Sequence, residues 1–500
     1  MLRMFEQARS NINRPSFVQQ ASRLSSSLTA TASHKLAVAP MPLLDQMGAL
    51  GKGYVNFNRT AFFGIQHILR TNVPLFQHLI DDLGANPQYI FLSGKGYSDN
   101  EEAEHLLENT LGIRYFKLNP AYAAMPGKYQ EVLRTHLRNN WDLFLKTIKG
   151  KDIEKIVVFD EGGHCFETMP ESLCFKYSMV GIEQTRGGLY SPSIEVLPFP
   201  LIEVASSALK RSLESPLIIE AVISKLKKLL QRKNTHINEE TVFGVVGNGA
   251  IGSHLTQYLL SSGHHVMAFD ENATAFVGPS WKQKNFYRAR DIREVIVRAS
   301  YIFGCTGKDI TQGASEYLHT LARDKVFVSC TSEDKEFKTL LRTISENKDS
   351  RQLEDPAFLE KESELRYISE SGGVLTVLGR GFPINFDHSG ESVPADQIQL
   401  TRALMLAAFI QGSTQAQTLS GEGRINTPPR IMVHPFLQQY IARQFHTYQS
   451  SNTLLANKWQ SFEDLHWIAN QSSGQVIEDT TFFEHFQEHV NKAGTLRPCP

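Results

Sequence analysis

One short segment constrains the fold more than any other part of the chain. The residues Gly247-Asn248-Gly249-Ala250-Ile251-Gly252 directly follow the apolar run 241–246 and open a helical pattern that continues to Leu260. Glycines at this spacing allow a tight turn, a bare backbone at the helix start, and close packing of the helix on the strand. The free N–H groups of such a helix start attract an anion. The segment therefore predicts a βαβ unit that binds the pyrophosphate of a dinucleotide.

An acidic residue indicates which dinucleotide is preferred. Asp270 stands at the end of the next predicted strand, 265–269, and Glu271 follows it. A carboxylate at this point accepts hydrogen bonds from the 2′-hydroxyl of a ribose and repels a 2′-phosphate. We therefore expect NAD, rather than NADP, as the cofactor.

Apolar and amphipathic runs alternate on both sides of this turn. Strands are predicted at 89–93, 156–160, 241–246, 265–269, 301–304, 326–329 and 374–378, and helices at 76–83, 100–111, 217–232, 250–260 and 396–411. This rhythm predicts an α/β fold in which a doubly wound parallel Rossmann NAD domain is inserted beside an α/β substrate-binding domain. The expected boundaries are 41–215 and 386–450 for the substrate-binding domain, 216–385 for the NAD-binding domain, and 451–500 for a C-terminal helical tail.

The charge balance argues against nucleic acids and membranes as partners. The chain has 51 basic and 52 acidic residues, for a formal net charge of −1, so it lacks the basic excess that wrapping DNA or RNA requires. The most apolar run, 403–410, is far shorter than the roughly 20 residues of a membrane span. We expect a soluble protein with a small-molecule substrate.

Cysteine usage and the N-terminal composition bear on the compartment. The 5 cysteines include no CxxC pair, so neither disulfides nor a metal site is expected. Residues 1–40 form a basic, Ser-rich segment that we interpret as a flexible leader, typical of a transit peptide. The expected location is cytoplasmic, with the mitochondrion as the alternative in a eukaryote.

Five further segments occur in a recognisable order around the glycine turn. They are Phe159-Asp160-Glu161-Gly162-Gly163-His164, Gly181-Ile182-Glu183-Gln184-Thr185-Arg186-Gly187-Gly188, Pro200-Leu201-Ile202-Glu203-Val204, Cys305-Thr306-Gly307, and Gly379-Arg380 followed by Asn385. Together they resemble motifs of the adenosylhomocysteinase (S-adenosyl-L-homocysteine hydrolase) family, over roughly residues 60–415.

The resemblance implies a reaction and a set of site residues. Enzymes of that family hold NAD, oxidise the ribose 3′-hydroxyl of S-adenosylhomocysteine, eliminate homocysteine, add water and reduce the ketone again. The positions that match catalytic ones are His67, Glu161, Gln184, Lys210 and Glu214, and those that match cofactor contacts are Thr185, Thr306, Gly307 and Asn385. A homo-oligomer is also implied.

Several positions differ from the family pattern, and most of them belong to its substrate site. Gln184 replaces a glutamate, Ser215 an asparagine, Ile219 a cysteine and Ser332 a histidine, and the adenine-binding run His-x-Thr-x-Glu reads His67-Ile68-Leu69-Arg70-Thr71. We therefore expect an altered substrate pocket for S-adenosylhomocysteine or a related thioether. Two alternatives stay open: a non-catalytic NAD-binding regulatory paralogue, and an NAD-dependent dehydrogenase that releases NADH.

Overall fold

The structure is a computed structural model. It describes residues 38–233, 237–276, 281–346, 364–418, 430–449, 476–477, 486 and 488–489. Residues 1–37 of the leader expected at 1–40 lie outside the described residues. Most positions of the helical tail expected at 451–500 also lie outside them.

The first lobe is built on a wholly parallel sheet. Among the described residues its strands follow the order β15-β14-β6-β5-β4-β1-β2-β3. The strands are β1 (Thr60–Gln66), β2 (Ile90–Gly94), β3 (Arg114–Phe116), β4 (Lys155–Asp160), β5 (Ser178–Glu183), β6 (Leu201–Glu203), β14 (Arg430–Met432) and β15 (Val476–Ile477). Each neighbouring pair runs parallel.

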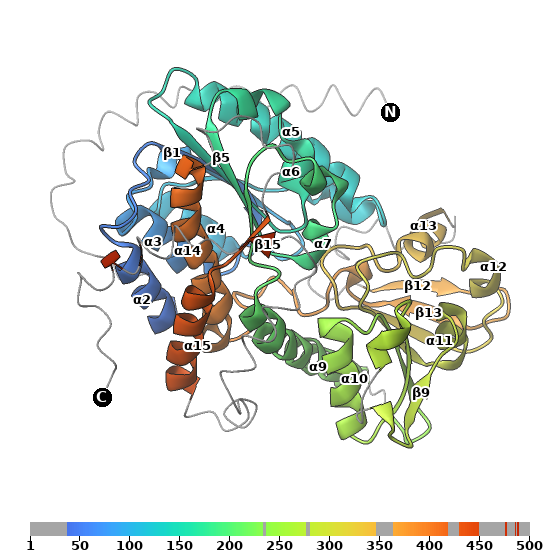
Figure 1. Cartoon of the computed structure of the whole chain (residues 1–500). Coiled ribbons are helices and arrows are strands. Elements are labelled where there is room, and N and C mark those ends of the chain that lie inside the picture. Colours follow the sequence, from blue (N-terminus) through green and yellow to red (C-terminus); the bar gives the residue numbers. More distant parts are fainter. Residues whose placement is uncertain are drawn as a thin grey trace, which may run out of the picture. The chain divides into compact units, whose positions relative to one another are not determined.

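Helices cover both faces of this sheet, which explains why its central strands read as continuous apolar runs. The helices of the lobe are α2 (Pro42–Gly51), α3 (Asn72–Asp81), α4 (Glu101–His105), α5 (Tyr129–Ile148), α6 (His164–Thr168), α7 (Arg186–Leu189), α8 (Pro192–Glu195), α14 (Ala395–Thr418) and α15 (Pro435–Gln449). On one face Phe62 and Phe159 pack edge-on against Phe409 of α14, which runs beside α2 (Figure 1). Gly64 of β1 leaves the space that the Phe159 ring fills.

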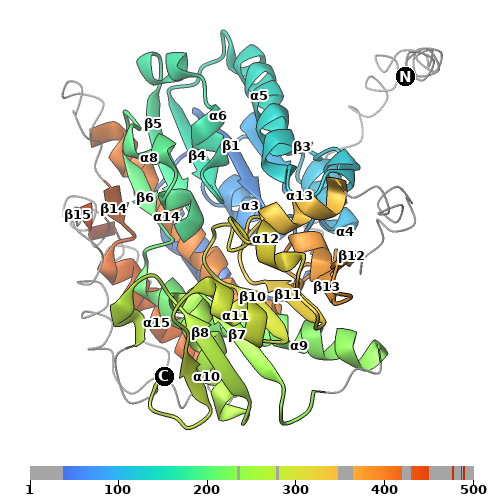
Figure 2. The ribbon, with the colours of Figure 1, turned by 90° about the vertical axis from the view of Figure 1, so that its right-hand side faces the viewer.

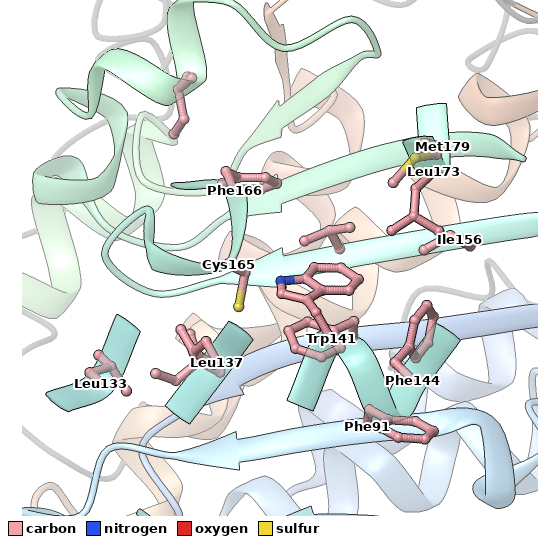
Figure 3. Packing of buried hydrophobic residues seen from close by; sticks show 14 of the residues in the cluster. Phe91, Leu133, Leu137, Trp141, Phe144, Ile156, Cys165, Phe166, Leu173 and Met179 are labelled. Carbon is pink, nitrogen blue, oxygen red and sulfur yellow. The ribbon is translucent and has the colours of Figure 1, made fainter. Parts of the chain in front are cut away.

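The opposite face packs against α5, α6 and α8 (Figure 2). Trp141 of α5 is fully buried and stacks on Phe63 of β1, with ring centroids 3.5 Å apart. Phe144 meets the same two rings edge-on, and Phe91 of β2 lies next to Phe144 (Figure 3). This aromatic cluster fixes α5 on the sheet.

The second lobe carries the glycine turn. Among the described residues its sheet has the order β12-β13-β11-β10-β7-β8-β9, parallel except for the pair β12–β13. The strands are β7 (Val242–Val246), β8 (His265–Phe269), β9 (Phe286–Arg288), β10 (Tyr301–Gly304), β11 (Lys325–Ser329), β12 (Leu365–Ile368) and β13 (Val374–Val377). In chain order the parallel strands follow the 3-2-1-4-5-6 arrangement of a dinucleotide-binding Rossmann sheet, so the predicted fold class is confirmed.

Two helical layers sandwich this second sheet. One contains α9 (Ser215–Arg232) and α10 (Ala250–Ser261), and the other contains α11 (Ile292–Arg298), α12 (Ser315–Leu318) and α13 (Lys338–Glu346). Phe243, Val245 and Phe303 point to the first layer, whereas Ile302 and Phe327 point to the second. Successive side chains of each strand therefore point alternately into the two hydrophobic cores on the two faces of the sheet.

The structure departs from the sequence prediction at several elements. β15 joins the first sheet from within the range assigned to the helical tail, so that sheet extends beyond residue 450. The helix expected at 100–111 becomes the short helix α4 followed by a π-helical turn, Leu106–Thr110. Short strands such as β9 and β12 went unpredicted because three or four residues carry too little periodicity. The longer β1 and β5 also went unpredicted, because each is buried along almost its whole length and interrupted by a glycine, so it shows no polar alternation.

We predict that Trp141→Ala lowers the free energy of unfolding by about 3–5 kcal/mol, because it removes a fully buried ring that neighbouring side chains cannot replace. Leu143→Ala on the same helix is the control, since Leu143 is 40% exposed. Urea unfolding followed by far-UV circular dichroism measures both. Equal losses for the two variants would contradict the assignment of the core.

Candidate functional site

Both sheets reverse their strand order at a defined point, and the candidate residues follow the strands at these points. In the first sheet β1 lies beside β4, so His67 and Glu161, which follow these strands, are brought together. In the second sheet β7 lies beside β10, which places Gly247 next to Cys305. In doubly wound sheets ligands bind in the crevice outside the carboxyl ends of the strands at such points.

His67 and Glu161 form a buried acid–base pair. The imidazole Nε2 of His67 lies 3.1 Å from Oε1 of Glu161, and the backbone N–H of His67 donates to Oε2 at 3.2 Å. Ser98 Oγ lies 2.6 Å from Nδ1 on the other side of the ring. Phe386 stacks on the imidazole with centroids 4.1 Å apart. The ring is therefore held in one orientation by a hydroxyl, a carboxylate and an aromatic face.

Burial and neighbouring charge decide which partner of this pair is ionised. Burial lowers the pKa of His67 more than the Glu161 carboxylate raises it, which keeps the imidazole neutral. Burial alone would raise the pKa of Glu161, but the electrostatic interaction and hydrogen bond with His67, together with the charges of Lys95 and Lys210, hold it far below its usual range. The pair at neutral pH is thus a carboxylate beside a neutral imidazole that can accept a proton.

The turn between β4 and α6 is shaped by two further buried acids. Glu183 accepts the N–H groups of Gly162 and Gly163 at 3.2 and 3.1 Å, and Asp160 accepts that of Cys165 at 2.6 Å. Burial, together with the charge of Asp160, raises the pKa of Glu183 to about 8. This network positions Glu161, which stands between them in the chain.

A second acid–base pair comes from the π-helical turn Lys210–Glu214. Nζ of Lys210 lies 2.5 Å from Oε2 of Glu214, and the Thr401 hydroxyl of α14 donates to Oε1 at 2.8 Å. Lys210 acts electrostatically on Glu161, and Arg402 of α14 on both acids. The two pairs are therefore within electrostatic reach of each other.

The other predicted site residues, Gln184, Asn385 and Thr185, differ in whether their side chains already have hydrogen-bond partners. Gln184 is buried and its Oε1 has no hydrogen-bond partner among the described residues. Asn385 is also buried, and neither polar atom of its amide has such a partner. Thr185 instead caps α7 and donates to Glu183 at 2.7 Å. Gln184 and Asn385 are free to meet a ligand, whereas the Thr185 hydroxyl is already engaged.

The glycine turn has the shape that a dinucleotide requires. Gly247 has φ of +94°, and a Cβ on Gly252 would lie 1.7 Å from the Gly247 carbonyl oxygen, so neither position accepts a side chain. Gly249 faces open space, with no atom within 4 Å of a Cβ built there. Asp270 Oδ2 accepts the N–H of Asn248 at 2.6 Å, which fixes the acid beside the turn. Its oxygens keep lone pairs for ribose hydroxyls.

The Cys305-Thr306-Gly307 turn lies against this glycine turn but is occupied by an internal carboxylate. Glu336 Oε1 accepts the N–H groups of Thr306 and Gly307 at 2.7 and 2.5 Å, and Thr331 donates to the same oxygen at 2.8 Å. Burial raises the pKa of Glu336 to about 7 despite these bonds. Contacts from Thr306 and Gly307 to a cofactor would therefore compete with Glu336.

A buried ion pair joins the two lobes. Glu333, in the loop after β11, lies 2.5 Å from His164 Nε2 of α6 and also accepts from Gln130 at 2.9 Å. Lys335 approaches the same carboxylate at 3.1 Å. Burial alone would lower the pKa of His164, but the Glu333 charge raises it to about 9. The pair closes the carboxyl ends of β4 and β11 onto each other.

The structure adds site residues that sequence reasoning missed. Lys95 is fully buried, its Nζ has no hydrogen-bond partner among the described residues, and its charge acts on Asp160, Glu161 and Glu333. Ser98 and Arg402 are the other additions. Only the position of Lys95 and Ser98 just after a predicted strand offered a signal.

Among the described residues, no group of three or more His, Cys, Asp or Glu side chains is arranged to hold a metal ion. No helix in the described part of the chain is long and apolar enough to cross a lipid bilayer.

Comparison with known proteins identifies distant relatives. No family model matches the chain. Two strains of Mycobacterium tuberculosis have proteins, "Uncharacterized protein MT0113" and "Uncharacterized protein Rv0104", that are 25% identical over 382 residues, covering 75% of this chain and 68% of theirs.

Among solved structures, D-lactate dehydrogenase from Escherichia coli aligns with a TM-score of 0.31 and 12% identity, over 73% of this chain and 99% of that enzyme. The acyclic imino acid reductase Bsp5 aligns with a TM-score of 0.23 and 13% identity, over 40% of this chain and only 62% of its own. Likenesses this weak carry no argument about the site.

We predict that His164→Gln lowers the free energy of unfolding by about 3–5 kcal/mol at pH 6, because it leaves Glu333 buried without its partner. A His pKa raised to about 9 contributes stability that is complete below about pH 6.5 and is lost as the pH rises through 9. The gap between wild type and variant should therefore shrink by about 3 kcal/mol between pH 6 and pH 10.

Urea unfolding midpoints at the two pH values measure this gap. The exposed His105, changed to Gln, serves as the control and should reproduce the wild-type pH dependence. A gap for His164→Gln that is the same at both pH values would show that the ion pair does not titrate as assigned.

Proposed function

We propose that the protein is a nicotinamide-dinucleotide-dependent dehydrogenase that acts on a small polar substrate. It would interconvert a secondary alcohol, or carbinol, and the corresponding ketone. The observation that supports this most is the proximity of two acid–base pairs, the buried His67–Glu161 and the half-buried Lys210–Glu214, at the strand ends of a sheet whose neighbouring lobe carries a glycine turn open to a pyrophosphate. Acid–base pairs and glycine turns are each common alone, and their combination is typical of dehydrogenases.

The residues present fit NAD at the second lobe. The bare Gly249 and the N-terminus of α10 would hold the pyrophosphate, and Asp270 would hold the adenosine ribose. When bound, the nicotinamide supplies a hydride acceptor and donor.

The chain's own groups handle the proton that accompanies the hydride. In the reducing direction the Lys210 ammonium donates a proton to the oxygen of the ketone, and in the oxidising direction it takes that proton back. Glu214, fixed by Thr401, holds the Lys210 side chain in place. The neutral His67 beside ionised Glu161 is a second group that can take up a proton from the substrate.

A second candidate is the adenosylhomocysteinase-type reaction. It is favoured by the convergence of His67, Glu161, Lys210 and Glu214, which the resemblance assigned to one site. However, Thr71 stands where the family's adenine-binding acid would be, and its hydroxyl accepts from Arg402 at 3.4 Å. We therefore rank this reaction below an open dehydrogenase.

The deciding experiment records absorbance of the NADH band under anaerobic conditions, with NAD⁺ and a panel of secondary alcohols that includes adenosine and S-adenosylhomocysteine. Free NADH that passes a filtration membrane supports the dehydrogenase. Reduced cofactor that stays on the protein, with homocysteine released, supports the second candidate. Bound NAD that no compound reduces supports a non-catalytic paralogue and contradicts the proposal.

We expect Lys210→Met to lower turnover on any responsive substrate by a factor of about 100 or more, since general acid–base groups contribute about 10²–10⁴-fold. NAD affinity, measured by calorimetry, should stay within about twofold of wild type because Lys210 belongs to the other lobe. An unchanged turnover would remove Lys210 from the mechanism.

Cofactor binding itself is tested by Gly249→Val. The added side chain enters open space, so folding should be retained, while NAD⁺ affinity should fall by about 100-fold or more because the pyrophosphate can no longer approach the backbone. Gly187→Val is the matched control, because Gly187 of α7 also faces open space but lies on the first lobe. Equal affinity in the two variants would place the cofactor elsewhere.

A further inference from the structure

The site contains a buried arginine that the proposed chemistry does not use. Arg402 of α14 is 3% exposed, and its Nε has no hydrogen-bond partner among the described residues. The one hydrogen bond that these residues give its guanidinium is from Nη2 to Thr71 Oγ1, at a long 3.4 Å. A guanidinium has five N–H donors, and leaving them unpaired in a buried place costs several kcal/mol.

Acids face Arg402 without binding it. Its charge interacts with Glu161, Glu391 and Glu214, yet none of these forms an ion pair with it in the described structure. Glu161 is engaged with His67, and Glu214 with Lys210 and Thr401. Burial raises the pKa of Glu391 to about 7, so that acid is only partly ionised at neutral pH. The neighbouring acids therefore favour the ionised form of the guanidinium, but none of them accepts a hydrogen bond from it.

The location of Arg402 relates its unpaired N–H donors to the substrate. Arg402 follows Thr401, which contacts Glu214, and it interacts with Glu161 of the other acid–base pair. The guanidinium thus lies within electrostatic reach of both acid–base pairs. A planar fork of N–H groups matches two oxygens of a carboxylate or a phosphate, held by two parallel hydrogen bonds.

We propose that Arg402 binds an anionic group of the substrate, a carboxylate or a phosphate monoester, and so determines which carbinol reaches the acid–base pairs. The inference rests on the proposed dehydrogenase function but concerns recognition rather than the chemical step. It also predicts that adenosine binds poorly, because a neutral base in this place would leave the guanidinium buried and unpaired.

A binding experiment tests the anion site without any turnover. Thermal unfolding of the full chain is followed with sodium malonate, sodium lactate or glycerol 3-phosphate, each against sodium chloride of equal ionic strength. We expect at least one of these anions to raise Tm by a few degrees in the wild type and to have no such effect on Arg402→Met. A purely structural arginine would lower Tm when replaced, whereas a buried charge without a partner predicts that Arg402→Met is at least as stable as wild type.

Arg114→Gln is the control variant, because Arg114 lies on β3 and stacks on the Phe91 ring away from the site. It should keep the full Tm response to the anions. A Tm response that persists in Arg402→Met, or a response in neither protein at saturating anion, overturns the proposal. So does a large loss of Tm in both Arg402→Met and Arg402→Lys.

The turnover test separates this inference from the proposed function. With NAD⁺, lactate and malate represent carboxylates, glycerol 3-phosphate represents phosphate esters, and propane-1,2-diol and adenosine represent neutral carbinols. We expect kcat/KM to favour one anionic class, and Arg402→Gln to lower it by at least about 100-fold for that class, a much larger loss than for neutral carbinols, whereas Arg114→Gln keeps the wild-type value. Arg402→Lys should restore part of the loss.

Each outcome has one meaning. Turnover of neutral carbinols as fast as anionic ones, or an anionic preference that survives Arg402→Gln, overturns the inference and leaves the dehydrogenase intact. An anion-dependent Tm response that requires Arg402, without reduction of NAD⁺ by any compound, supports the anion site and overturns the dehydrogenase.

Discussion

The carboxylate of Glu161 is the group on which the candidate site depends. It is buried at the end of β4, where an isolated charge would be prohibitively costly, and its ionised state exists only because His67, Lys95 and Lys210 surround it. These three side chains, a neutral imidazole and two amines, come from the ends of β1 and β2 and from the π-helical turn before α9. One buried charge thus requires that several separate segments adopt their native positions together.

The same requirement extends across the junction of the lobes. Lys95 acts on Glu161 and on Glu333, and Glu333 in turn holds His164, so charges of alternating sign run from the first lobe into the loop after β11. Such a network is favourable only when it is complete, because each member left alone would be a desolvated charge. The lobes are therefore coupled by electrostatics as much as by apolar packing.

Local sequence patterns were sufficient for seven of the strands, for the glycine turn and for the inserted arrangement of the second lobe, but they missed the central strands β1 and β5 of the first sheet. Val242–Val246 and the glycines after it are read within a dozen residues, and their geometry agrees with the expectation. The resemblance assigned His67, Glu161, Lys210 and Glu214 to one site, and in the structure they form two pairs, with Lys210 acting electrostatically on Glu161. Sequence patterns could not identify four further residues of the network, because a polar residue in a local window looks like any other. These residues are Lys95, Ser98, Glu333 and Arg402. Their significance comes from burial and from partners far away in the chain.

The first sheet is completed only by its last strands. β14 pairs with β6 and β15 with β14, yet the whole second lobe lies between β6 and β14 in the sequence. α14, which covers one face of β1 and β4 and carries Arg402, also follows that insertion. During synthesis the first half of the chain must therefore wait, with an apolar sheet face and one sheet edge uncovered, until almost everything else has emerged. Contacts this distant in sequence slow folding, whereas the contiguous second lobe can assemble first and bring the returning chain close to its destination.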